Sequence, residues 1–302
     1  MANIVFIGGT GRCGTHITKD ILTLHSRVCS LPFEYRFIID PDGLVDFYCG
    51  AIDPWSPYMI SKRLERLKKL FDDLSARDSS RYNDWGLERH IPGWNSLVDG
   101  LMEQLTDFSY DATWCGGTKN DERMSFAAPK TYDALAGIIG GFIQTIADGI
   151  VRKAGAAIFV EDNTWNILFA NELATFVPDA KFIHVYRDPR DVVDSMANQA
   201  WCPDSRLQCA QMYVAIMREW SEIKSRLPQE QIFEFSIDHL VANRHEVTGK
   251  ICDFIGIDCE MQMAEIDLNA GHLGRWVAGY SKEDKKSVLP LLEPYIQLLG
   301  YK

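Results

Sequence analysis

The chain has 302 residues, of which 46% are hydrophobic and 24% are charged, and its formal net charge is -11. This length and composition predict a globular protein with one large core or at most two domains, and they exclude disordered, fibrous and repetitive chains. The negative charge argues against a nucleic-acid binder and against a protein that binds anionic membranes, because those partners favour a basic surface.

The first 80 residues predict a strand, a glycine turn and two helices. The stretch IVFIGG at 4–9 is apolar and β-branched, as in a buried strand, and the apolar spacing of 16–25 fits a helix face. Residues 28–35 are expected to be extended, and the proline and glycine of DPDGLVDFYCG at 40–50 indicate a loop. Apolar residues recur with the period of an amphipathic helix over 58–78.

The rest of the chain predicts a region of weak periodicity followed by alternating helices and strands. Residues 75–130 carry polar, glycine- and tryptophan-containing segments, where we expect substrate-facing loops and helices. The stretch 132–155 predicts a helix interrupted by Gly140 and Gly141. After it we predict strands at 156–163, 180–188 and 231–237 and helices at 166–178, 189–198, 206–227 and 244–256.

This alternation predicts an α/β fold, a three-layer sandwich in which a mainly parallel central sheet is covered by helices on both faces. No linker separates two compositional halves, so we expect residues 1–302 to form a single domain. The first strand is predicted near Asn3, which leaves no room for a signal peptide. No apolar run approaches the roughly 18 to 20 residues of a membrane span. The eight cysteines form no C-x-x-C pair, so we expect free thiols in a cytoplasmic setting without a membrane span.

A glycine cluster follows the first strand, in the sequence NIVFIGGTGRCGTH. A strand that ends in glycines and opens a helix exposes backbone N–H groups at the positive end of the helix dipole, which favours an anion. Gly9, Gly11 and Gly14 satisfy the dinucleotide pattern G-x-G-x-x-G, and Glu34 lies at the distance of the ribose-binding acid. That acid should end a second strand, whereas Glu34 follows a proline.

The same turn lacks the residues of a nucleoside-triphosphate loop. Thr15 stands where the phosphate-binding lysine should be, and His16 stands where the magnesium-binding hydroxyl should be, so an ATPase or kinase is not expected. Arg12 instead offers a guanidinium beside the anion, with Thr15 and His16 as further donors.

A second candidate segment is AKFIHVYRDPRDVVDSMAN. Arg187 lies at the predicted end of a strand, and Ser195 lies about two turns into the helix that begins at Pro189. These two side chains are suited to hold a second anion. The alternative is a surface turn in which Arg187, Arg190 and the neighbouring aspartates pair among themselves.

Together the two segments resemble the sulfotransferases that use 3′-phosphoadenosine 5′-phosphosulfate (PAPS). RCGTH is similar to the family loop that binds the 5′-phosphosulfate, and Arg187, Asp188, Asp191 and Ser195 match its R-D-x-x-D-x-x-x-S motif for the 3′-phosphate. The stretches EDNTWNILFANELATFVPDAKFI, FEFSIDHLVAN and GHLGRWVAGYSKEDKKSVLPLLEPYIQLLGY resemble further family segments. The sequence departs from the family pattern at Cys13, Ile237 and 269–271.

The resemblance implies a P-loop-like sulfotransferase fold and transfer of a sulfuryl group from PAPS to an acceptor hydroxyl, giving adenosine 3′,5′-bisphosphate (PAP), without a metal. The implied acceptor is a small molecule, a carbohydrate or another hydroxyl compound, bound by a largely helical and loop region at about 40–155. The implied catalytic residues are Glu34 as the base, Arg12 at the leaving oxygen and His16 as a supporting donor. The implied cofactor-binding residues are Gly11, Arg12, Cys13, Gly14, Thr15, His16, Arg187, Ser195, Arg275 and Trp276.

Two alternatives remain from the sequence alone. One is an NAD(P)-dependent oxidoreductase that uses the glycine turn as a dinucleotide site, and the other is a nucleotide-binding protein that keeps the fold without catalysis.

Overall fold

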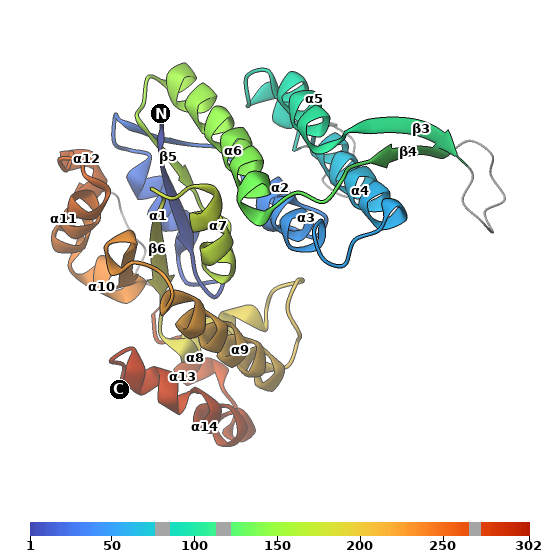
Figure 1. The fold of residues 1–302 in the computed structure, drawn as a ribbon. Coiled ribbons are helices and arrows are strands. Elements are labelled where there is room, and N and C mark those ends of the chain that lie inside the picture. Colours follow the sequence, from blue (N-terminus) through green and yellow to red (C-terminus); the bar gives the residue numbers. More distant parts are fainter. Residues whose placement is uncertain (76–84, 113–121, 266–272) are drawn as a thin grey trace. The chain divides into compact units, whose positions relative to one another are not determined.

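A computed structural model describes residues 1–75, 85–112, 122–265 and 273–302 (Figure 1). The chain divides into two compact units. Unit 1 comprises Met1–Ala2, Leu31–Phe159 and Glu172–Pro178, and unit 2 comprises Asn3–Ser30, Val160–Asn171 and Asp179–Lys302. Strand β5 (Ile158–Glu161) and helix α7 (Ala170–Phe176) cross the boundary between them. The single domain expected from the sequence stays a prediction.

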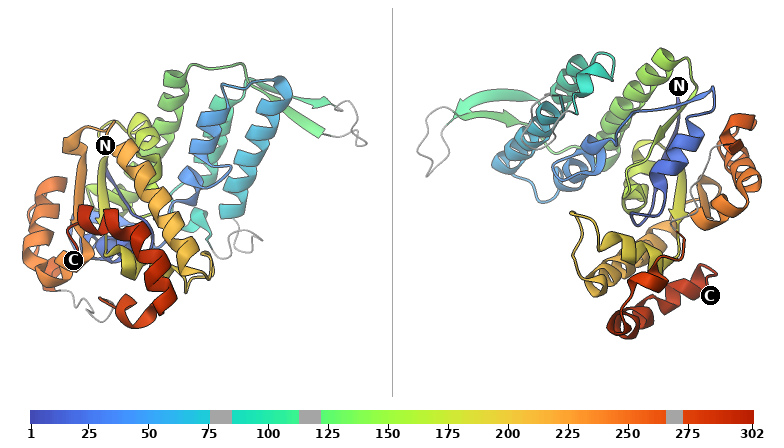
Figure 2. Two further views of the ribbon diagram at one scale, coloured as in Figure 1. Left: turned by 90° about the horizontal axis from the view of Figure 1, so that it is seen from below. Right: turned by 180° about the vertical axis from the view of Figure 1, so that it is seen from behind.

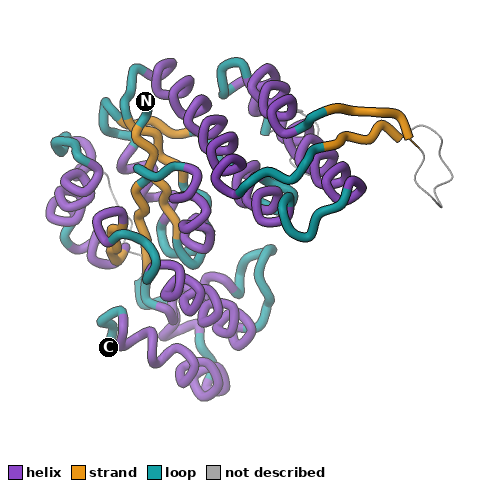
Figure 3. The backbone as a smooth tube through the Cα atoms, viewed as in Figure 1, coloured by secondary structure: helices purple, strands orange, loops and turns teal. Residues whose placement is uncertain are grey.

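The central sheet has five strands in the order β2-β5-β1-β6-β7. Its remaining strands are β1 (Asn3–Gly8), β2 (Val28–Ser30), β6 (Lys181–Tyr186) and β7 (Ile232–Ser236). Figure 3 draws the strands of the chain in orange. β1 pairs with β6 and β6 pairs with β7, both in parallel, so that Phe6 lies opposite Phe182. The mainly parallel sheet of the predicted α/β fold is therefore confirmed.

Helices flank this sheet in unit 2. They are α1 (Thr15–Leu22), η2 (Asn166–Phe169), α8 (Pro189–Met196), α9 (Arg206–Lys224), η3 (Gln229–Gln231), α10 (Ile237–Ala242), α11 (Arg244–Ile255), α12 (Met261–Glu265), α13 (Trp276–Gly279) and α14 (Lys282–Leu298). α1 packs on β1 and β2, whereas α10 and α11 pack on β7. α14 packs on α8 and α9, so the C-terminal helix supports the segment that follows β6.

The interior of β1 and β6 forms the core beneath the candidate site. Ile7 and Ile183 are fully buried, and the rings of Phe6 and Phe182 stack with centroids 5.8 Å apart. Burial of each such side chain contributes about 1.5–3 kcal/mol of transfer free energy. The strand ends that carry the glycine turn and Arg187 therefore rest on a closely packed base.

A partly buried polar cluster joins β6, β7 and α9. Opposite each other in register, His184 and Glu234 share a hydrogen bond of 2.7 Å between Nδ1 and Oε1. Trp220 Nε1 and Lys224 Nζ donate to the same carboxylate at 3.0 and 2.7 Å. Burial alone would raise the pKa of Glu234, but the donors and charges around it lower that pKa to about 2. His184 is thus a structural residue of the sheet.

We expect this cluster to make the protein sensitive to acid. Because the pKa of Glu234 is lower in the folded chain than its ordinary value of 4.5, its contribution to stability is complete above about pH 4.5 and is lost as the pH falls toward 2. Urea unfolding at pH 7, 4 and 3 should show a smaller fall in the midpoint for Glu234→Gln than for the wild type. Equal falls for both proteins would contradict this account.

Unit 1 is built mainly from helices. Its elements are α2 (Arg36–Ile39), α3 (Leu44–Gly50), α4 (Pro57–Ser75), η1 (Leu87–Arg89), α5 (Trp94–Leu105), β3 (Phe108–Ala112), β4 (Glu122–Phe126) and α6 (Tyr132–Ala154). Phe37, Phe71, Trp94 and Phe142 pack together at the core, with ring centroids 5.2–6.2 Å apart. The predicted amphipathic helix at 58–78 is confirmed as α4 up to Ser75.

Helix α6 corrects two expectations. It runs unbroken through Gly140 and Gly141 over 23 residues. A Cβ atom at Gly140 would overlap the backbone carbonyl of Phe176, so this glycine permits a close approach of chain segments and does not end the helix. By length and composition α6 is also apolar enough to cross a membrane, with a mean hydropathy of 1.6, and 56% of that window is buried in the structure. Core helices of globular proteins pass the same test.

Two further elements of unit 1 differ from the prediction. Residues 40–43 form the expected turn, closed by the bond from Gly43 N to Asp40 O at 2.8 Å, but Leu44–Gly50 are helical as α3, with Leu44 and Phe47 buried. The second difference is the antiparallel hairpin β3–β4, which lies in the region of weak periodicity and packs on α4 (Figure 2).

Candidate functional site

The glycine turn is closely packed between β1 and α1. Gly11 and Gly14 have φ angles of 85° and 104°, which residues with side chains rarely adopt. A Cβ atom at Gly9 would overlap the Cys13 Sγ and lie 2.6 Å from the Val185 carbonyl. No described side chain caps the N-terminus of α1. The backbone N–H groups at the start of α1 are therefore available to an anion.

Arg12 occupies a strained position at the centre of the turn. Its φ of 58° is in the left-handed region, which costs a non-glycine residue about 1–3 kcal/mol. The side chain is exposed, and its Nε donates to the Ser195 Oγ at 3.0 Å. Strain of this kind persists where the surrounding structure fixes the backbone, and it is common at functional sites.

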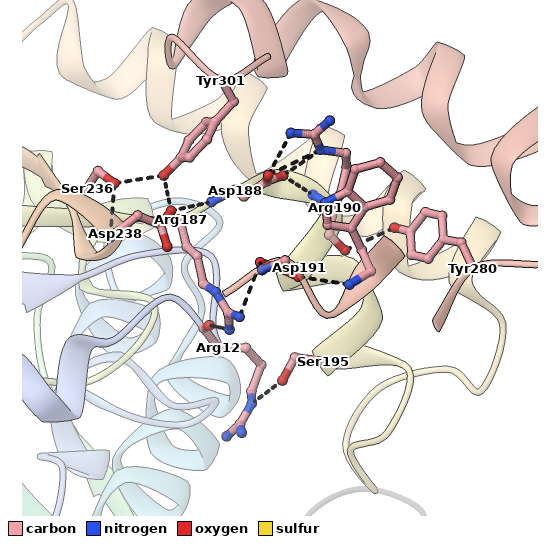
Figure 4. Close-up of polar contacts among 12 residues, drawn as sticks. Arg12, Arg187, Asp188, Arg190, Asp191, Ser195, Ser236, Asp238, Tyr280 and Tyr301 are labelled. Carbon is pink, nitrogen blue, oxygen red and sulfur yellow. Dashed lines mark hydrogen bonds and ion pairs between the residues drawn. The ribbon is translucent and has the colours of Figure 1, made fainter. Parts of the chain in front are cut away.

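Arg187 contacts the same turn from the end of β6. Its Nη1 donates to the Arg12 carbonyl at 3.4 Å, and its Nη2 lies 3.5 Å from Asp191 Oδ2 (Figure 4). The residue is only 9% exposed. The two segments that the sequence analysis selected, the turn at Arg12 and the β6–α8 segment with Arg187 and Ser195, thus lie in hydrogen-bond contact.

The carboxylate of Asp191 ties α8 to the segment before α13. It accepts hydrogen bonds from the backbone N–H of Gly274 at 2.7 Å and of Trp276 at 3.0 Å. The Arg190 guanidinium stacks on the Trp276 ring, 4.3 Å from its centroid. Of the predicted cofactor residues, Trp276 therefore packs on α8, and the backbone of Arg275 lies beside the same carboxylate. Residues 269–271 lie outside the described residues.

The neighbouring β7–α10 segment completes this side of the site. Asp238 Oδ2 accepts from the backbone N–H of Asp188 at 3.2 Å and from the hydroxyl of Tyr301, which also bonds Ser236 at 2.7 Å (Figure 4). Ile237, one of the departures from the family pattern, packs against the turn, since a Cβ at Gly14 would lie 2.8 Å from its side chain. The apolar side chain fills the space beside Gly14.

His16 turns toward an acid that the sequence analysis did not select. Its Nδ1 lies 3.0 Å from the Oδ2 of Asp162, the residue that follows β5, and Lys19 Nζ lies 3.3 Å from the same oxygen. Asp162 and Lys19 are buried, whereas the His16 side chain is 66% exposed. A carboxylate directly after a buried strand, in the sequence IFVED, is the signal that would have found Asp162.

Cys13 and Thr15, both predicted cofactor residues of the turn, are buried. The Cys13 side chain has no exposed surface, and burial raises the pKa of its thiol. Thr15 is 8% exposed and begins α1. Any contribution of Cys13 to anion binding therefore comes from its backbone N–H, not from its sulfur.

Glu34, the predicted base, belongs to unit 1, whereas the turn and β6–α8 belong to unit 2. Its carboxylate pairs with the Arg36 guanidinium. β2 ends at Ser30, so Glu34 does not end a second strand as a ribose-binding acid would. Its role as the base stays a prediction.

Two solved structures share this fold. The sulfotransferase domain from the curacin biosynthetic pathway has a TM-score of 0.54 at 12% identity, covering 100% of this chain and 99% of that one. The sulfotransferase domain of the Synechococcus PCC 7002 olefin synthase has a TM-score of 0.53 at 13% identity, covering 100% and 97%. Similarity at these identities concerns the fold alone. A comparison with curated proteins finds no match.

The family is given by the sequence itself. Residues 63–261, more than half of the chain, match the model of the sulfotransferase family. The matched range includes Arg187 and Ser195 and thus the β6–α8 side of the site. This match does not fit the alternative of an NAD(P)-dependent oxidoreductase. The chain belongs to the sulfotransferase family.

Proposed function

We propose that this sulfotransferase moves a sulfuryl group from PAPS to an acceptor hydroxyl, releasing PAP and a sulfate ester. The observation that carries the proposal is the contact between the glycine turn and β6–α8, through Arg12 with Ser195 and Arg187 with the Arg12 carbonyl. Both segments offer donors to anions, and PAPS carries an anionic group at each end of its ribose. A single-anion ligand would leave one of the two segments without a role.

In this proposal the turn binds the 5′-phosphosulfate and β6–α8 binds the 3′-phosphate. Backbone N–H groups around Gly14 and the start of α1 would hold the first group. The Arg187 guanidinium would hold the second, because its planar fork matches phosphate oxygens. Ser195 contacts Arg12. The backbone around Arg275 and Trp276 would border the nucleotide.

The reaction requires stabilisation of negative charge on the oxygen that leaves the sulfur. The acceptor oxygen forms a bond to sulfur while the bond between sulfur and the bridging oxygen breaks, and the acceptor proton passes to a base. Fixed cations at the bridging oxygen stabilise such a transition state. We assign this role to Arg12, which remains charged and cannot protonate the leaving group.

The acceptor would bind in the region at about 40–155, which supplies most of unit 1. This unit contains a small cavity with a mainly apolar lining, which includes Phe47, Ile60, Leu105 and Leu135, with Lys130 as its charged lining residue. We propose a small-molecule, carbohydrate or other hydroxyl acceptor.

Thermal unfolding in the presence of nucleotides tests the donor. A ligand that binds only the folded chain stabilises it by about 2.7 kcal/mol at 100 times its dissociation constant. We expect PAP to raise the melting temperature, and NAD and ATP at equal concentration to leave it nearly unchanged. A response to NAD without a response to PAP would overturn the proposal.

Labelled PAPS separates an enzyme from a nucleotide-binding protein without catalysis. With a panel of phenol, sugar and alcohol acceptors, we expect transfer of the label to at least one acceptor. Binding of PAP without transfer to any acceptor and without release of labelled sulfate would favour the second alternative.

A further inference from the structure

The contact of His16 with Asp162 has the arrangement of a histidine oriented by a buried acid. Asp162 is 2% exposed, and its Oδ2 faces both His16 Nδ1 at 3.0 Å and Lys19 Nζ at 3.3 Å. A carboxylate that accepts from an ammonium group acts as a hydrogen-bond acceptor. His16 Nδ1 therefore donates to it, and in the neutral ring this leaves the lone pair on Nε2.

The Nε2 side of the ring is open. The His16 side chain is 66% exposed, and Nε2 lies 4.0 Å from Asp20 Oδ1 on the next turn of α1. His16 directly follows Thr15 in the first turn of α1, so it is adjacent to the turn in which we place the phosphosulfate. A neutral imidazole in this position accepts a proton at Nε2 and is held by its other nitrogen.

The segment that contains Asp162 has several buried polar atoms without a hydrogen-bond partner. Among the described residues, Asp162 Oδ1, Asn163 Nδ2 and Trp165 Nε1 are all buried without a hydrogen-bond partner. Unsatisfied buried polar atoms are costly and few in native proteins, and three in four residues require an explanation. The carbonyl of Thr164, within the same segment, accepts from the backbone N–H of Gly9 at 2.8 Å. This polar segment thus lies against the glycine turn.

We propose that His16 Nε2 takes the proton of the acceptor hydroxyl, with Asp162 as the positioning residue and Lys19 holding Asp162. This inference rests on the proposed sulfuryl transfer. The hydroxyl O–H bond breaks and its proton moves to Nε2 while the oxygen bonds to sulfur. The electron pair of the broken sulfur–oxygen bond remains on the phosphate oxygen of PAP. The resulting imidazolium is stabilised by the Asp162 carboxylate, as in other histidine–carboxylate pairs.

This assignment competes with Glu34, which pairs with Arg36 in unit 1. It also gives His16 a different role from that of a supporting donor at the leaving group. A donor would need a hydrogen on Nε2, whereas the bond to Asp162 places the hydrogen of the neutral ring on Nδ1.

Kinetics of four variants test the assignment. His16→Asn keeps a side-chain N–H for Asp162 but has no basic nitrogen, so transfer of label from PAPS should fall by about 10²–10⁴ while PAP affinity stays within about threefold. Asp162→Asn should lower kcat by about 10-fold or more with little change in the KM for PAPS. Asp20→Asn removes an equal charge near His16 and should retain near-normal kcat. Glu34→Gln tests the competing assignment of the base. Loss of activity in Glu34→Gln with normal activity in His16→Asn would overturn the proposal.

Nitrogen-15 NMR of histidine-labelled protein tests the orientation without any acceptor. The wild type should show His16 with its hydrogen on Nδ1 at neutral or higher pH, and Asp162→Asn should change the Nδ1 signal and leave those of His184 and His239 in place. A hydrogen on Nε2 in the wild type would overturn the proposal. Failure of the wild type to bind PAP would contradict the proposed function. Binding and transfer by the wild type, with an unchanged kcat for Asp162→Asn, would contradict only the assignment of His16 and Asp162.

Discussion

Replacement of Arg187 by alanine should weaken PAP binding by roughly 100-fold or more in isothermal titration calorimetry. Arg187 is 9% exposed, and its guanidinium contacts the Arg12 carbonyl and Asp191. A phosphate bound here is largely removed from water, so loss of its charged partner is expensive. The same change also removes the cation that pairs with Asp191 and the hydrogen bond to the Arg12 carbonyl. Part of the lost affinity therefore comes from a change in the geometry of the turn.

Three further variants separate the loss of a phosphate contact from a change in the geometry of the turn. Arg187→Lys keeps the charge but not the two-pronged geometry, so it should recover only part of the affinity. Asp191→Asn keeps Arg187 but removes its carboxylate partner, and a milder loss is expected. Arg218→Ala removes a positive charge from the surface of α9 and should bind PAP normally. Affinity within threefold of the wild type for Arg187→Ala, with an unchanged melting temperature, would show that the 3′-phosphate site is elsewhere.

The fold was predictable where local pattern and tertiary packing agree. The β-branched strands and the alternating helices carry strong periodicity, so the parallel sheet follows from the sequence. α3 was missed because Pro41 and Gly43 indicate a turn, and only the burial of Leu44 and Phe47 shows that a helix follows it. From the sequence, Gly140 predicts an interruption of the helix. The structure explains this glycine by the close approach of the Phe176 carbonyl, which belongs to a distant segment and leaves no local pattern.

The parts of the site that lie within one segment of the chain could be predicted from the sequence. The sequence places Arg187 at a strand end and Ser195 in the next helix, and the structure has both there. Asp162 was missed because its partners His16 and Lys19 lie more than 140 residues away in the chain and meet it only through the sheet. A periodic pattern reports which face of an element is buried, but it carries no information on which buried acid meets which base.

Replacement of Arg12 by alanine should lower kcat by about 10²–10³, the usual cost of removing one group that stabilises charge in the transition state. PAP affinity should fall less, because the backbone N–H groups of the turn and Arg187 remain. Alanine keeps a Cβ at the φ of 58°, so the backbone strain is unchanged and the loss measures the guanidinium. Arg12→Lys should recover part of kcat as a point charge. Equal losses in kcat and in PAP affinity would assign Arg12 to binding alone.

The hydroxyl of Ser195 accepts a hydrogen bond from Arg12, and a double-mutant cycle tests whether it orients the guanidinium. If its hydroxyl serves mainly to orient the guanidinium, through the bond of 3.0 Å to Nε, then Ser195→Ala should lower kcat in the wild type but hardly at all in the Arg12→Ala background. The coupling free energy from this double-mutant cycle should reach about 0.5–3 kcal/mol, the range for side chains in direct contact. If Ser195 instead binds the 3′-phosphate independently, the two losses should add, and the PAP affinity of Ser195→Ala should fall in both backgrounds alike.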